Sequence, residues 1–68
     1  MLIKISTGGA AFHAPYPEND SEEDIAMSEE LRHIFDRICA QIADGGRRSG
    51  RIIDSNGNSA GEWDLDKD

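Results

Sequence analysis

The chain has few side chains of the types that perform acid–base or nucleophilic chemistry. His13, His33 and Cys39 are the conventional candidates. His33 lies six positions before Cys39, which is about 240° around an α-helix, so the two cannot meet there as a base and a nucleophile. We expect Cys39 at the edge of the core and His13 in a loop. The chain has no Cys/His spacing of the zinc type, and we predict no catalytic residue, no metal and no cofactor.

Two other motifs contain ligand-like groups, and each has a simpler structural interpretation. Residues 54–58, Asp-Ser-Asn-Gly-Asn, begin like a calcium loop because oxygen-bearing side chains alternate there. Such a loop needs glycine at its sixth position and glutamate at its twelfth, where this chain has Ser59 and Leu65. Gly8-Gly9 has neither a helix directly after it nor a lysine to hold phosphate. We expect a hairpin turn at the first motif and a bend at the second.

Carboxylates dominate the charge of the chain. Acidic side chains number 14 against 7 basic ones, for a formal net charge of -7. Two interpretations stay open: the acids keep a small protein soluble, or they form a negative surface that binds a basic partner and competes with nucleic acid for it. Under the second interpretation, the partner-binding residues are Glu18, Asp20, Glu22, Glu23, Asp24, Glu29 and Glu30, with a second patch of Glu62, Asp64 and Asp66.

The length of 68 residues leaves room for one domain, residues 1–68. A chain this short buries roughly 60% of the surface that its unfolded form exposes. A deep, water-excluding cleft is therefore hard to build, and we predict that the protein is not an enzyme; catalysis would need an active site shared within an oligomer. No stretch approaches the roughly 20 apolar residues of a membrane span, and Arg47, Arg48 and Arg51 are too few to hold nucleic acid against the net charge. We expect a cytoplasmic monomer that contacts neither a membrane nor nucleic acid directly.

The hydrophobic pattern predicts one helix near the middle of the chain. Apolar residues recur there at spacings of three and four and form one stripe: Met27, Leu31, Ile34, Phe35, Ile38 and Ile42. Ser28 is the expected N-cap, with Ser21 as the alternative for an earlier start, and Asp44-Gly45-Gly46 is the expected end. Residues 1–7 alternate as a strand, and Ala10-Ala11-Phe12 either continues that strand after a bulge or forms a loop whose Phe12 enters the core.

The C-terminal part predicts a β-hairpin. Asn56-Gly57 separates two strand-like runs, residues 50–54 and 59–66, and is typical of a type I′ turn. This turn places Ile52 opposite Gly61 and Gly50 opposite Trp63. Glu62 and Asp64 then point to the other face, which we expect to be wet and acidic. The predicted fold is α+β, a small antiparallel sheet of about three strands packed on one amphipathic helix. The predicted core is Ile3, Ile5, Phe12, Leu31, Ile34, Phe35, Ile38, Ile42, Ile52, Trp63 and Leu65.

The order of these segments also carries a resemblance. The opening ISTGGAAF (5–12), an acidic spacer, one amphipathic helix and then DSNGNSAGEW (54–63) together resemble a group of small acidic proteins encoded by bacteriophages and prophages. Some members of that group look like anti-CRISPR proteins, in particular inhibitors of type I systems such as type I-C. The resemblance implies a protein that binds a basic Cas subunit of a type I interference (Cascade) complex inside the host bacterium, imitates DNA, and occupies the site where target DNA enters.

A rival interpretation comes from a different functional class. The protein would be a small phage or mobile-element accessory protein that binds a host or structural partner without catalysis. Its contact surface would be the exposed helix end or the Pro15-Tyr16-Pro17 loop. The two interpretations differ in their salt dependence, because screening of the carboxylates weakens an acidic mimic.

Overall fold

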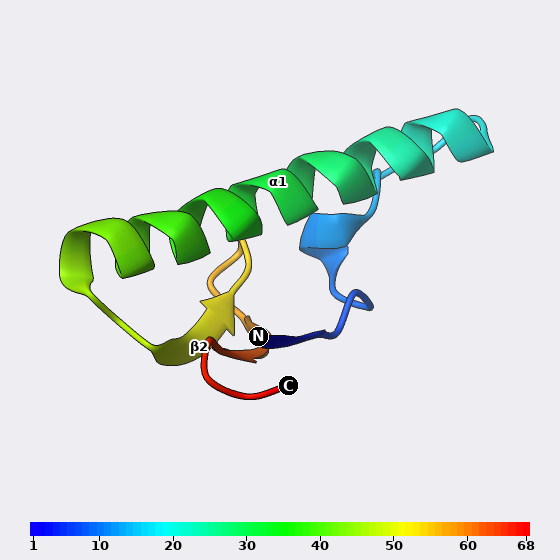
Figure 1. The fold of residues 1–68 in the computed structure, drawn as a ribbon. Coiled ribbons are helices and arrows are strands. Elements are labelled where there is room, and N and C mark those ends of the chain that lie inside the picture. Colours follow the sequence, from blue (N-terminus) through cyan, green and yellow to red (C-terminus); the bar gives the residue numbers. More distant parts are fainter.

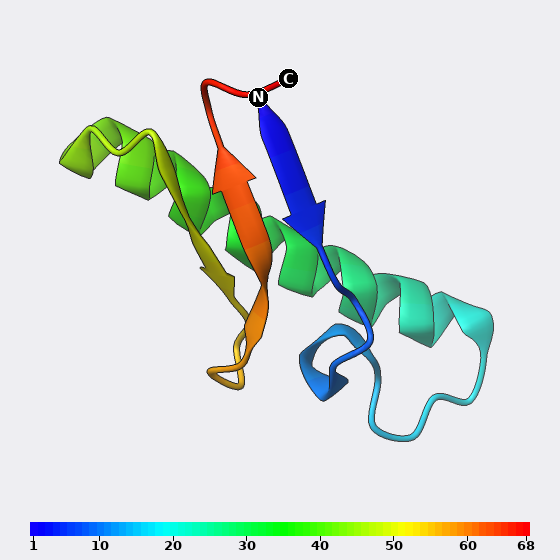
Figure 2. The ribbon, with the colours of Figure 1, turned by 90° about the horizontal axis from the view of Figure 1, so that it is seen from below.

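A computed structural model describes residues 1–68 and has the predicted α+β architecture. One long helix lies across one face of a three-stranded antiparallel sheet with strand order β1-β3-β2 (Figures 1 and 2). The elements are β1 (Leu2–Ile5), the short 3-10 helix η1 (Ala10–Phe12), α1 (Asp20–Gly45), β2 (Ser49–Ile53) and β3 (Ser59–Asp64). No helix combines the length and the apolar character needed to cross a membrane.

Helix α1 begins two turns before the apolar stripe. Its N-cap is Asn19, whose side-chain oxygen accepts a hydrogen bond from the Glu22 backbone N–H at 3.0 Å, so both predicted caps are wrong. Ser28 lies inside the helix and its hydroxyl donates to the Ile25 carbonyl oxygen. The end is as predicted, because Gly46 adopts the left-handed conformation with φ 63° and donates to the Ile42 carbonyl oxygen. The acidic spacer, residues 18–30, is therefore helical from Asp20 onward.

The hairpin has the predicted register but a different turn. Gly50 lies opposite Trp63 and Ile52 opposite Gly61. Of the turn residues only Gly57 has a positive φ, 83°, so the turn is not type I′. Instead a three-residue loop, 55–57, is closed by the Gly57 N–H donating to the Asp54 carbonyl oxygen at 3.0 Å, and the register shifts after Ile52.

The Asp54 side chain explains why the turn takes this form. This carboxylate is only 4% exposed, and its Oδ1 accepts hydrogen bonds from the N–H groups of Asn56 and Asn58, each at 2.9 Å. Aspartate commonly closes a turn in this way by binding its own backbone two residues on. The first residue of the calcium-like motif is therefore a turn-forming side chain.

The core lies between α1, η1 and the sheet. Its fully buried apolar residues are Phe12, Ile34, Ile38, Ile52, Ala60 and Trp63, and Ile3, Ile5, Ala11, Met27, Leu31, Ile42 and Leu65 pack around them. Phe12 is 0% exposed and enters the core from η1. Of the two alternatives for residues 10–12, the continued strand is therefore wrong and the entry of Phe12 into the core is confirmed.

Two predictions about the core were wrong. Phe35 is 42% exposed and Cys39 is exposed, because each follows a buried isoleucine and so lies about 100° further round the helix.

Glycines shape the sheet around Trp63. A Cβ at Gly50 would stand 2.8 Å from the indole Nε1 of Trp63, so the ring fits only because Gly50 has no side chain. Gly61 has φ 155°, and a Cβ there would overlap the backbone carbonyl oxygen of Lys4 on the neighbouring strand. The Trp63 N–H and the Gln41 side-chain oxygen are both buried without a hydrogen-bond partner. Packing rather than polar contacts therefore holds the tryptophan.

Candidate interaction surface

The net charge of the protein is concentrated at one end of α1. Residues 5–31 contain seven carboxylates and no lysine or arginine, whereas the rest of the chain contains seven carboxylates and seven cationic side chains. The seven carboxylates of residues 5–31 all lie within residues 18–30, which we call the acidic segment. Figure 1 shows the first turns of α1 reaching past η1 and away from the sheet. The formal charge of -7 thus belongs to one projecting part of the fold.

Glu30 is the member of the acidic segment that the structure removes from the surface. Its side chain is 6% exposed, and its carboxylate accepts hydrogen bonds from the Ser55 N–H at 2.7 Å and the Ser55 hydroxyl at 2.5 Å. Position 30 lies four residues before the buried Ile34, on the same side of the helix. The exposure expected of Glu30 is wrong, because this carboxylate is buried where it holds the hairpin tip against α1.

Two further carboxylates of the acidic segment bind the loop that leads into α1. Glu23 accepts a hydrogen bond from the Ala14 N–H at 3.0 Å and pairs with His13 Nδ1 at 2.8 Å. Glu22 accepts from the Glu18 N–H at 2.8 Å. Both acids also lie in the first turn, where negative charge complements the helix dipole. These two side chains therefore have structural roles in addition to any contact with a partner.

The position of His13 requires a protonated ring. Its Nδ1 faces the Glu23 carboxylate and its Nε2 faces the Thr7 carbonyl oxygen, both at 2.8 Å. Both partners are acceptors, so both ring nitrogens must donate. The hydrogen bonds to Glu23 and then to Thr7 raise the pKa of His13, and the hydrogen bond from His13 lowers the pKa of Glu23. His13 thus fastens the end of the β1 loop to the first turn of α1.

This fastening predicts a pH dependence of stability. The His13 contribution is fully present below the ordinary histidine pKa of about 6.5 and is lost as pH rises through the raised pKa of His13. The Glu23 contribution is present above the ordinary glutamate pKa and is lost as pH falls through its lowered pKa. The stabilisation by His13 is measured as the melting temperature of the parent minus that of His13→Gln. We expect this difference to fall as pH is raised through the titration of His13, which is recorded by NMR. A measured His13 pKa at or below the ordinary histidine value of about 6.5 would contradict this geometry.

The remaining carboxylates of the acidic segment are Glu18, Asp20, Asp24 and Glu29. All four are exposed, and the three ion pairs of the structure include none of them. Together with the half-buried Glu22, the three helical members Asp20, Asp24 and Glu29 extend along roughly 14 Å of helix axis. Four charges over this length are separated by about 4.5 Å on average, which is wider than the roughly 3.4 Å per phosphate along one strand of DNA.

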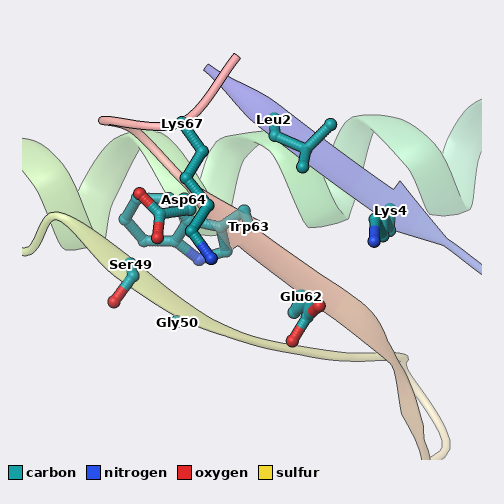
Figure 3. A pocket seen from close by; sticks show the side chains of 8 residues that line it. All are labelled: Leu2, Lys4, Ser49, Gly50, Glu62, Trp63, Asp64 and Lys67. Carbon is teal, nitrogen blue, oxygen red and sulfur yellow. The ribbon is translucent and has the colours of Figure 1, made fainter.

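The second predicted patch is not an acidic surface. Glu62 lies between Lys4 of β1 and Arg51 of β2 in the strand register. Asp64 lines a pocket of about 310 Å³ with Lys4 and Lys67, on the face of the sheet that points away from α1 (Figure 3). Asp66 is ion-paired with Arg48, and their hydrogen bond lowers the pKa of Asp66 and raises that of Arg48. The prediction of an acidic sheet face is wrong, because cations from β1, β2 and the C-terminal segment share it.

The structure also contains a groove that sequence reasoning missed. It lies between α1 and the loop after η1 and has a volume of about 540 Å³. Ile25 lines this groove and is 56% exposed. The available sequence signal was Asn19-Asp20-Ser21-Glu22, an N-cap residue followed three positions later by glutamate. That pattern starts the helix early and so places Ile25 on a helical wall.

The candidate chemical groups remain dispersed in the fold. His33 and Cys39 are exposed on α1, and no three His, Cys, Asp or Glu side chains come together as a metal site requires. Comparison of the chain with protein-family models, with curated proteins and with solved structures finds no match. The geometry and charge of the molecule itself therefore carry the functional argument.

Proposed function

We propose that the protein acts without catalysis, as an acidic inhibitor of a nucleic-acid-handling complex. Following the resemblance in its sequence, the target is a type I CRISPR interference (Cascade) complex in the cytoplasm of a bacterial host. The protein binds a basic Cas subunit as a monomer and occupies the site where target DNA enters. The observation that carries the proposal is the confinement of the whole net charge to residues 5–31.

Charge spacing supports mimicry of DNA by this segment. Four carboxylates follow one another about every 4.5 Å along the axis of α1, the same order as the roughly 3.4 Å between phosphates along one strand; they belong to Asp20, Glu22, Asp24 and Glu29. Effector complexes hold nucleic acid in positively charged channels that read its backbone. A rigid helix presents its charges without the entropy that an unfolded acidic tail would lose on binding. The contact surface is therefore Glu18, Asp20, Glu22, Asp24 and Glu29, without Glu30 and without the mixed sheet face.

The test is target-DNA binding by a purified type I surveillance complex with and without the protein. The test variant is Asp20→Asn/Asp24→Asn, and the matched control is Asp36→Asn/Asp44→Asn, which removes the same charge from the same helix outside the acidic segment. We expect the protein to block DNA binding, the test variant to need at least about fivefold more protein, and the control to act like the parent. Added salt should weaken the parent more than the test variant.

Two outcomes would contradict the proposal. Unaffected DNA binding across several type I complexes would remove the inhibitory function. Equal behaviour of the two double variants would leave the acids as a solubility feature. Glu23 and Glu30 stay unchanged in this design, because their loss would disturb the loop and the hairpin tip.

A second candidate function is supported by the exposure of Tyr16. This side chain is 92% exposed between two prolines, and tyrosine is enriched where proteins bind one another. In this alternative the protein is an accessory protein of a phage or mobile element that binds a host or structural partner through residues 15–17. Binding to that partner would survive high salt and would be lost in Tyr16→Ala, the opposite of the result expected for an acidic mimic.

A further inference from the structure

The groove between α1 and the loop after η1 combines apolar walls with negative charge. One wall is formed by Ala11 of η1 together with Ala14 and Pro15 of the loop that follows, and Ile25 and Ala26 contribute from α1. Ile25 is 56% exposed, more than any other large apolar side chain except Tyr16. An exposed aliphatic side chain within a concave apolar surface offers a place for another apolar group to pack.

Carboxylates flank Ile25 on both sides. Glu22 lies three residues before it and Glu29 four residues after it, and both line the groove. These spacings put all three on one strip of the helix. No lysine or arginine lines the groove. Its imidazoles are His13, already paired with Glu23, and His33. The groove thus has an apolar centre between two negative positions.

We propose that this groove binds a basic segment of the partner protein in which one apolar side chain packs against Ile25 while flanking lysine or arginine side chains contact Glu22 and Glu29. The inference rests on the proposed function and identifies the part of the acidic segment that gives specificity. Charge complementarity determines the partner, because every unpaired charge beside Ile25 is negative. A DNA mimic that used charge alone would bind any cationic surface, whereas the apolar contact selects among basic partners.

The groove also occupies a defined place in the fold. Glu23 and His13 hold the loop against α1, with Glu23 accepting from the Ala14 N–H at 3.0 Å. The buried Glu30, bonded to Ser55, closes the end of the groove at the hairpin tip. Both walls are therefore fixed before a partner arrives, which reduces the entropy lost on binding.

The experiment is an NMR titration of the ¹⁵N-labelled full chain with a capped seven-residue peptide that carries leucine between two pairs of lysines. A second peptide, with serine in place of leucine, has the same charge. The groove variant is Ile25→Ser/Glu29→Gln. The matched control is Phe35→Ser/Asp36→Asn, which removes one exposed aromatic side chain and one exposed charge from the same helix away from the groove. The same samples are examined by sedimentation for self-association.

We expect saturable shifts at the amides of Ala14, Ile25, Ala26 and Glu29 with the leucine peptide, and binding at least about tenfold weaker for the serine peptide and for the groove variant. The control variant should bind like the parent. Equal binding of both peptides, shifts spread over the whole acidic segment, or a dimer of the chain that the peptide does not dissociate would overturn the inference. Because the titration uses no CRISPR complex, loss of peptide binding with intact inhibition contradicts only the groove, and the reverse result contradicts only the proposed function.

Discussion

Replacing Trp63 with alanine is expected to leave the protein largely unfolded at room temperature. The side chain is 2% exposed and lies at the centre of the core, and removing a fully buried tryptophan costs roughly 3 to 5 kcal/mol. A domain of this length has a free energy of unfolding of about 3 to 10 kcal/mol in total. Far-UV circular dichroism with urea measures the loss, since Trp63 is the chain's one tryptophan and fluorescence disappears with it.

Phe35→Ala is the matched control for this prediction. The hydrophobic pattern predicts a core position for Phe35 and a loss as large as that of Trp63. Its 42% exposure leads us instead to expect a loss of about 1 kcal/mol or less. Equal losses of unfolding free energy in the two variants would contradict the description of the core.

Replacing Gly61 with alanine is expected to detach β1 from β3. Gly61 has φ 155°, a backbone conformation that residues with a Cβ rarely adopt, and the added methyl group would overlap the Lys4 carbonyl oxygen. Gly61 lies in the central strand and pairs with Ile5 of β1 on one side and with Ile52 of β2 on the other, so its backbone is held from both sides. We expect a loss of more than about 2 kcal/mol of unfolding free energy, with faster hydrogen exchange at the Ser6 N–H, which donates to the Ala60 carbonyl oxygen.

Gly8→Ala controls for the loss of backbone freedom that any such substitution causes. A Cβ at Gly8 meets no atom within 4 Å, and its φ lies outside the positive range. The same change should therefore be neutral or stabilise the fold by up to about 1 kcal/mol, because it restricts the unfolded chain. Similar destabilisation in both variants would show that close approach of β1 to β3 is not the reason for glycine at position 61.

The fold could be predicted from sequence as far as it depends on local periodicity. The three- and four-residue spacing of apolar side chains identified α1, and the Asn56-Gly57 pair gave the register around Ile52 and Trp63, which is confirmed. The start of α1 escaped this reasoning because residues 20–26 have no complete apolar stripe. Their helical state depends on the Asn19 cap and on acids at the positive end of the helix dipole.

The candidate site was less predictable because burial of a carboxylate depends on distant donors. Glu30 is buried only because Ser55, 25 residues away, brings an N–H and a hydroxyl to it. Asp66 likewise meets Arg48 across the end of the sheet. Charge patterning identified where the acids are in the chain, and it could not tell which of them the fold uses for itself. Within the acidic segment, the residues that remain for the proposed contact with a partner are Glu22 and the exposed Glu18, Asp20, Asp24 and Glu29.

The two ends of the chain lie side by side, and this has a practical consequence. The Met1 ammonium is 3.0 Å from the Asp68 carboxylate, and Figures 1 and 2 place both ends beside the sheet, away from the first turns of α1. A tether or fused domain at either end would therefore leave the acidic segment facing solution. Adjacent ends of this kind also permit circular permutation through a short linker. The molecule can be immobilised by its termini in one orientation, with its charged helix pointing outward.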